Sequence, residues 1–393
     1  MNTILGEIGK SQKFIDLNKE IENKKSPIQV LGLTDVGMLQ ILGGINEFDK
    51  KPICIITYNE IQAKKIYEDI KYFTDKVVLF PKKEIVTYDY IAESKDLPYE
   101  RIDSLNKIVS KKNLIVITTI EAILQKIPDK KTLYQNEIEF KIGDIYNLED
   151  IKQRLIKLGY SRYDLIEGKG QFSIRGGILD ISVTENTGIR IEFWGDEVDS
   201  IRNFNITSQR SINTLEKAKI YPAHEYILEE PIEETCKKIR NLEGKEYSKE
   251  ILEEDIEQIK AGNYISKIDK YFNCFYNNQT TILDYLNKNY VIVFDEKRKI
   301  KQRTKNIIKD NENLIKLLVE KGKIVPQALE NLNTYEDIEE NLKEKQVIYL
   351  EKEDNDNITN IEKYKFNYRE INYYRSEIEQ FIKDIKTWIS LKK

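Results

Sequence analysis

The sequence predicts an α/β protein: a parallel sheet module followed by a smaller α+β domain with a mostly antiparallel sheet. Residues 1 to about 125 alternate short apolar runs with amphipathic helical patterns, which is typical of a parallel sheet covered on both faces. From about residue 134 to 218 the chain becomes rich in strand and turn signals. A length of 393 residues is enough for two or three domains with separate cores.

In the first part, short apolar runs predict strands and 3.6-residue periodicity predicts helices. The expected strands are 28–31, 53–57, 77–80 and 114–118. The expected helices are 38–48, 60–73 and 99–110.

The middle part begins with a helix over 148–158, for which Gly159 is a plausible C-cap. Strands are then expected at 171–175, 178–183 and 190–193. The Gly176-Gly177 step between the first two strands fits either a two-residue hairpin turn or a bulge, and both alternatives stay open.

After residue 222 helical patterns return, and further strands are expected at 290–294 and 347–350. A polar linker over 351–360 precedes a last helical pattern, 376–391, that carries apolar residues along one face. Because this apolar face has no evident packing partner, it favours the interpretation that the chain is a fragment of a longer polypeptide. The alternative is a terminal helix that docks back on its own domain.

Composition excludes several functional classes. The net charge is −4, whereas a strongly basic nucleic-acid binder would be positively charged. The three cysteines are far apart and His224 is the only histidine, so neither a zinc site nor a histidine-based triad is expected, and no metal site is predicted. No apolar run approaches about 18 residues and no secretory segment is present, which predicts a cytoplasmic protein without membrane contact.

Residues 28–39 (IQVLGLTDVGML) have the outline of a phosphate-binding loop without its chemistry. A strand leads into Gly32 and Gly37, but Met38 stands where a working loop has lysine, and Leu39 where it has Ser or Thr. Asp35 would also repel phosphates. We therefore interpret this segment as a degenerate nucleotide loop, a tight strand-to-helix turn rather than a nucleotide site.

Asp295 and Glu296 directly follow the expected strand 290–294 and resemble the acidic pair that orients magnesium and activates water in active ATPases. Without the loop's lysine and hydroxyl there is no phosphate–magnesium complex on which they could act. The pair is therefore interpreted as a relic in an exposed turn.

The strand that begins at Arg190 alternates polar and apolar residues. Because side chains alternate between the two faces of a strand, Ile191 and Phe193 are expected to enter the core while Arg190 and Trp194 face outward together. The sequence thus predicts a surface patch.

Three segments carry a family resemblance. They are 169–181 (KGQFSIRGGILDI), 190–202 (RIEFWGDEVDSIR), and 207–211 (TSQRS) closing with 221–225 (YPAHE). Together they closely resemble the N-terminal region of the bacterial transcription-repair coupling factor (Mfd) family, which is itself similar to the excision-repair protein UvrB.

The resemblance implies a RecA-like (P-loop NTPase-like) module in a UvrB-like 1A-2-1B arrangement. The implied units are a RecA-like domain 1A with the degenerate loop (1–127), an inserted UvrA-binding domain 2 (128–222), a domain 1B (223–365), and the truncated start of a following domain (366–393).

The resemblance also implies that UvrA binds through Arg175, Arg190 and Trp194. Guanidinium groups bind carboxylates with two hydrogen bonds, and an exposed indole can fill a partner pocket. The alternative is that Trp194 is a partly covered surface aromatic and that the arginines pair locally with Glu192 or Asp196.

The implied function is recruitment of UvrA, which links removal of stalled RNA polymerase to nucleotide excision repair. The segment itself is expected not to be catalytic; ATP and magnesium are expected only in the downstream motor of an ATP-dependent DNA translocase. RNA polymerase and double-stranded DNA would be bound by downstream domains.

One alternative is a UvrB-like DNA repair ATPase or helicase. Met38 disfavours it, as does the short stretch 88–98 with Tyr88 and Tyr90 where UvrB has a long aromatic β-hairpin. A second alternative is a free-standing scaffold protein with another partner.

Overall fold

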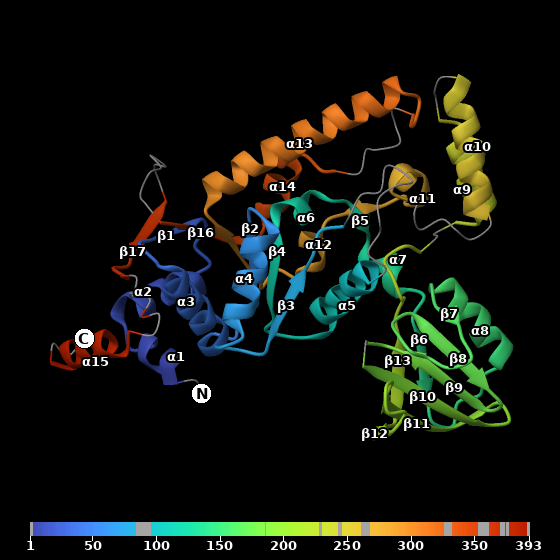
Figure 1. Cartoon of the computed structure of the whole chain (residues 1–393), viewed down its shortest axis with the longest axis horizontal. Helices are drawn as coiled ribbons and strands as arrows, with labels where there is room; N and C mark the ends of the chain where they lie inside the picture. Colours follow the sequence, from blue (N-terminus) through green and yellow to red (C-terminus); the bar gives the residue numbers. More distant parts are fainter. Residues whose placement is uncertain are drawn as a thin grey trace.

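The computed structural model describes residues 3–83, 96–184, 186–227, 230–242, 246–260, 268–325, 332–352, 361–369, 374 and 377–390. Tyr88 and Tyr90 lie outside these residues. Figure 1 shows a larger α/β part and, beside it, a smaller sheet domain drawn in green.

Within the described residues, seven parallel strands form the larger sheet. Their order is β17 (Glu362–Lys365), β1 (Ile28–Leu31), β16 (Gln346–Glu351), β15 (Val291–Asp295), β2 (Ile53–Thr57), β4 (Ile115–Thr119) and β3 (Val77–Phe80). The predicted strands agree with these bounds to within one residue. The predicted α/β class is therefore confirmed.

Alternate residues of each central strand enter different cores. In β2, Ile53 and Ile55 pack into one hydrophobic cluster, and Cys54 and Ile56 into the other. The first cluster lies under α2 (Gln12–Glu22), α3 (Asp35–Phe48) and α4 (Glu60–Ile70). The second lies under α5 (Leu97–Ser110), α6 (Ile120–Leu124), α12 (Ile282–Tyr285), α13 (Lys297–Glu320) and α14 (Tyr335–Leu342). The sheet is thus covered on both faces, as a parallel sheet requires.

The late strands belong to the same sheet as the early strands. β15 and β16 lie between β1 and β2, and β17 pairs with the outer edge of β1. β15, β16 and β17 therefore complete the sheet to which β1, β2, β3 and β4 belong. The reason is that β1 and β2 have no mutual pairing and are bridged only by these later strands.

Between residue 230 and β15 a helical cluster forms its own core. It contains α9 (Ile232–Arg240), α10 (Glu246–Lys260), the 3-10 helix η1 (Ile268–Tyr271) and α11 (Phe272–Phe275). In Figure 1, α9 and α10 (yellow) stand beside each other at the far end of α13 (orange). Two short pieces, β5 (Ile127–Pro128) and β14 (Gln279–Thr280), pair with each other and join this region to α7 (Lys130–Tyr134).

The second sheet is mostly antiparallel, as predicted. Its order is β12 (Ser211–Leu215), β11 (Glu197–Asn205), β10 (Thr187–Trp194), β9 (Ile178–Ser182), β8 (Gln171–Arg175) and β7 (Ser161–Arg162). A ribbon of β6 (Ile138–Lys141) and β13 (Lys217–Ile220) and the helix α8 (Leu148–Lys157) share its core. Arg175 pairs with Ile178, so the Gly176-Gly177 step is the two-residue hairpin turn. Gly176 has a φ of 60°, which glycine adopts without strain.

The terminal helices are α1 (Thr3–Ile8) and α15 (Ile378–Ser390). The predicted apolar face of α15 is present, and no residue of this helix is buried. The structure thus does not show the alternative in which this helix docks back on its own domain. In the part of the chain that the structure describes, no helix combines the length and the hydropathy needed to cross a membrane.

A buried ion pair ties the two parts of the molecule together. Arg101 on α5 donates from Nε and Nη2 to Glu225, at 2.8 and 3.2 Å, and from Nη1 to the Pro81 carbonyl. Both charged side chains are 1% exposed. Glu225 follows β13, so this pair joins the end of the second domain to the helix that covers the first sheet.

Replacing Arg101 by Ala should lower the free energy of unfolding by about 3–5 kcal/mol, because the Glu225 carboxylate would remain buried without its partner. Urea denaturation measures the difference. Lys237→Ala, which removes the exposed pair with Glu234, is the control and should leave the midpoint nearly unchanged. Equal stability of the Arg101→Ala and Lys237→Ala proteins would contradict the assigned role.

Candidate protein-interaction site

The alternation predicted for β10 is confirmed. Ile191 is fully buried and Phe193 is 9% exposed, both within the core of the second domain. Trp194 is 84% exposed. A register shift between Glu192 and Phe193 makes Asp199 the extra residue on β11, so it does not disturb the alternation along β10. The indole therefore projects from the face opposite the core.

Arg190 lies on the same face but is held by a local partner. Asp180 stands directly opposite it on β9, and its carboxylate accepts from Arg190 Nε at 2.7 Å and Nη2 at 2.9 Å. The guanidinium also lies 4.4 Å from the Phe204 ring and donates to Gln209. Only 17% of the Arg190 side chain is exposed, and its hydrogen bond to Asp180 raises the pKa of Arg190 further.

Arg175 shares the same carboxylate and stays accessible. Its Nη2 donates to Asp180 Oδ2 at 3.1 Å, and the side chain is 48% exposed. Both arginines thus pair locally, as in the alternative interpretation, but their partner is Asp180 and not Glu192 or Asp196. Glu192 instead accepts from Arg202 and Ser200.

Asp180 is the residue of the candidate site that the sequence did not predict. Its side chain is 1% exposed although it belongs to the outward face, because the two arginine side chains cover it. The signal was available: Leu179 and Ile181 flank it with the spacing of a core face, so an acidic residue between them must point to the other side.

The arrangement can bind a protein surface that has an acidic side chain and a pocket for an aromatic ring. One carboxylate is shared by two guanidinium groups, so the Asp180 cluster keeps one net positive charge. That charge is most accessible at Arg175. Arginine and tryptophan are the residues that most often dominate protein interfaces. Arg175 and Trp194 are therefore the side chains best placed to reach a partner, and Arg190 chiefly fixes the cluster.

The degenerate nucleotide loop is a strand-to-helix turn with a packed interior. Thr34 is the N-cap of α3 and accepts from the Gly37 amide at 3.1 Å. Met38 and Leu39 are 5% and 2% exposed and belong to the hydrophobic cluster under α3. Asp35 pairs with Lys65 at 2.6 Å and with Lys352 at 3.3 Å.

The chain itself covers this loop. After β17, the Phe366 amide donates to the Leu31 carbonyl at 2.9 Å and the Tyr368 amide to the Gly32 carbonyl at 3.2 Å. A Cβ atom on Gly32 would lie 2.2 Å from the Phe366 carbonyl oxygen, and one on Gly37 would lie 2.6 Å from the Tyr368 ring. Both glycines are thus in close contact with a later segment of the same polypeptide.

Asp295 is the last residue of β15, which is separated from β1 by one strand, and Glu296 follows as the N-cap residue of α13. Asp295 is 6% exposed, so the expected exposed turn is wrong for this residue, and its carboxylate accepts from Gln62 at 3.1 Å. Burial, with smaller effects of the charges of Glu296 and Asp35, raises the pKa of Asp295 to about 6. Glu296 has a φ of 63° and pairs with Lys299 at 2.8 Å. Across the described ranges, no group of three or more His, Cys, Asp or Glu side chains is placed to hold a metal ion.

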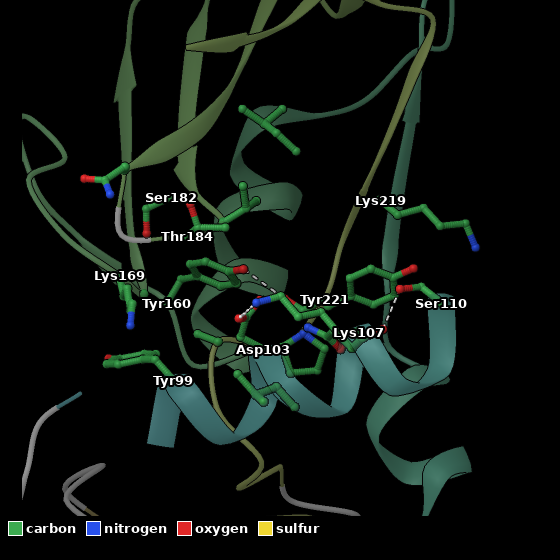
Figure 2. Close-up of a pocket in the computed structure, with 18 residues that line it drawn as sticks. Tyr99, Asp103, Lys107, Ser110, Tyr160, Lys169, Ser182, Thr184, Lys219 and Tyr221 are labelled. Atoms are coloured by element: carbon green, nitrogen blue, oxygen red, sulfur yellow. Dashed lines mark hydrogen bonds and ion pairs between the residues drawn. The ribbon is translucent and has the colours of Figure 1, made fainter. Parts of the chain in front are cut away.

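A cavity of about 510 Å³ lies elsewhere, between α5 and the second domain. Figure 2 shows its tyrosines, Tyr99, Tyr160 and Tyr221, together with Lys169 and the ion pair of Asp103 and Lys107. The Tyr99 ring packs so closely on Gly170 that a Cβ there would meet it at 2.3 Å. None of the predicted site residues lines this cavity, so it is a junction between the domains and not part of the candidate site.

Comparison with known proteins agrees with the fold. A family model described as the UvrB interaction domain matches residues 138–226, which contain the second sheet and all three predicted binding residues. A transcription-repair-coupling factor of Bacillus subtilis (strain 168) is 31% identical over 290 residues, which are 70% of this chain and 25% of the relative. One of Staphylococcus epidermidis is 26% identical over 335 residues, 81% of this chain and 28% of the relative.

This chain is a relative of the bacterial transcription-repair coupling factors. The resemblance inferred from the three sequence segments is thus confirmed. The chain spans about a quarter of the length of the transcription-repair coupling factors that it matches.

Asp295→Asn should stabilise the protein at pH 7.5 by about 1–3 kcal/mol. Because the folded pKa of Asp295, about 6, exceeds its ordinary value of 3.8, the ionised carboxylate opposes folding, and this cost appears as pH rises from 4 through 6. The asparagine keeps an acceptor for Gln62 without the charge. Urea denaturation at pH 7.5 and pH 4 measures the effect, which should shrink at pH 4. A variant less stable than the unmodified chain at pH 7.5 would refute the prediction.

Proposed function

We propose that this chain is the UvrA-recruiting part of a transcription-repair coupling factor, which links removal of stalled RNA polymerase to nucleotide excision repair. The observation that carries the proposal is the exposed pair of Arg175 and Trp194 on the outer face of the second sheet. That face lies within the residues that match the UvrB interaction domain.

The energetics of this face favour protein recruitment. An indole that is 84% exposed offers a large apolar surface that a partner can bury. Burying the indole in a pocket of a partner would release water from the ring and from the pocket surface. Arg175 can then form a charge-assisted contact with a partner carboxylate, which fixes the orientation of the complex.

The first sheet acts as a scaffold without ATP hydrolysis in this proposal. Met38 and Leu39 pack in the core, and Phe366 and Tyr368 lie on the loop glycines. ATP and magnesium would act in the motor of the parent protein, which would also contact RNA polymerase and double-stranded DNA. The location that we propose is the cytoplasm.

A UvrB-like ATPase or helicase is the competing function. The feature that could support it is Asp295 at the end of β15, where an active enzyme would hold magnesium. The buried apolar side chains of Met38 and Leu39, at the positions where a working loop has lysine and a hydroxyl, support the relic interpretation instead.

Removing either anchor should weaken UvrA binding. We expect Arg175→Ala and Trp194→Ala each to raise the Kd for purified UvrA by about 10-fold or more, because each removes an anchor at the centre of the face. Calorimetric titration of UvrA into the purified chain measures it. Arg154→Ala, on α8 at the core side of the same domain, is the matched control and should bind as the unmodified chain does.

Arg190→Ala is a less specific test of the same face. It leaves Asp180 with one guanidinium in place of two, so loss of binding would accompany loss of stability. Equal UvrA affinities of the unmodified chain, Arg175→Ala and Trp194→Ala would refute the assignment of the site.

The purified chain should release no phosphate from ATP above the protein-free background, with or without double-stranded DNA, because position 38 offers no cation to the phosphates. A phosphate-release assay measures this. Turnover that disappears in Asp295→Ala would overturn the prediction and restore the ATPase interpretation.

A further inference from the structure

A row of three side chains extends the exposed face past Trp194. Trp194 pairs with Glu197 across the β10–β11 hairpin. Glu197 in turn forms an antiparallel bridge with Ile145, which precedes α8. Residues paired directly across strands project from the same side of a sheet. Trp194, Glu197 and Ile145 therefore project in one direction, with the carboxylate in the middle.

Both apolar members of the row are in water. Ile145 is 76% exposed and Trp194 is 84% exposed. Two strand spacings separate them, roughly 10 Å. Ile142, in the same loop as Ile145, is 51% exposed as well. Single exposed apolar residues are ordinary, but an aligned set beside an arginine is typical of an interface.

The backbone holds Ile145 in place. The Gly143 amide donates to the Val198 carbonyl and the Tyr146 amide to the Asp196 carbonyl, each at 2.8 Å. The Val198 amide donates to the Asp144 carbonyl at 2.9 Å. Tyr146 itself packs against the core of the domain. Ile145 thus costs little conformational entropy when a partner covers it, since its backbone is already fixed.

We propose that Ile145 is a second apolar anchor of the UvrA-binding face, and this rests on the proposed function. The surface would run from Arg175 through Trp194 and Glu197 to Ile145. The part of UvrA that it fits has a carboxylate opposite Arg175, two apolar contacts for the indole and the isoleucine, and a basic group between those contacts opposite Glu197. Two observations favour UvrA over a second copy of the chain. The row continues the proposed Arg175–Trp194 face, and the row itself contains no cation that could pair with Glu197 of another copy.

The test compares three alanine variants of the whole chain in calorimetric titrations with purified UvrA. Ile145→Ala should raise the Kd by about 10-fold. Ile156→Ala is the matched control. Ile156 is an exposed isoleucine of the same domain, on α8, the helix that covers the opposite face of the sheet. The Kd of this variant should stay within about 2-fold of the unmodified chain. Trp194→Ala reports on the first apolar anchor.

The outcomes separate the two proposals. If the unmodified chain does not bind UvrA, the proposed function fails. If Trp194→Ala binds as tightly as the unmodified chain, Trp194 is not an anchor and the second-anchor proposal fails with it. If Trp194→Ala weakens binding while Ile145→Ala behaves as Ile156→Ala does, the function stands and the second anchor is refuted. If Ile145→Ala alters self-association of the chain in sedimentation and leaves UvrA binding unchanged, the row belongs to an interface between copies and the inference is overturned.

A charge reversal gives an independent readout. Glu197→Lys leaves both apolar contacts in place and sets a cation against the expected basic group. UvrA binding should weaken and become tighter as salt is raised, because screening reduces the repulsion. Unchanged affinity at every salt concentration would overturn the proposed order of charges.

Discussion

The outer face of the second sheet depends on the pairing of the Asp180 carboxylate with two arginines. The carboxylate is nearly inaccessible to water, and it accepts hydrogen bonds from Arg175 and Arg190 at once. A buried charge of this kind is tolerated only when donors surround it. The pairing therefore fixes one guanidinium against Phe204 and leaves the other at the surface. The position of the accessible positive charge follows from this one buried group.

Much of the fold could be predicted because the strands of a parallel sheet are apolar on both faces. The runs that became β1, β2, β3 and β15 stand out in the sequence for that reason. Their order could not be predicted, because pairing between distant segments leaves no local pattern. β17 was missed for a related reason: its residues are charged and only Tyr364 packs inward.

The candidate site was predicted only in part. Period-two alternation was enough to turn Trp194 outward and Phe193 inward. It could not reveal that Asp180 binds Arg190, since this depends on the register between β9 and β10. The nucleotide loop shows the same limit. Its missing lysine is visible in the sequence, whereas the contact of Phe366 and Tyr368 with the loop joins segments more than three hundred residues apart.

The bridging of β1 and β2 by late strands has a consequence for synthesis on the ribosome. The neighbours of β1 are β16 and β17, so this strand, buried along its whole length, stays unpaired until residues 346–365 have emerged. All strands of the second sheet come from one contiguous stretch and can pair much earlier. The nascent polypeptide can therefore fold the second domain before β1 pairs with β16 and β17 in the larger sheet.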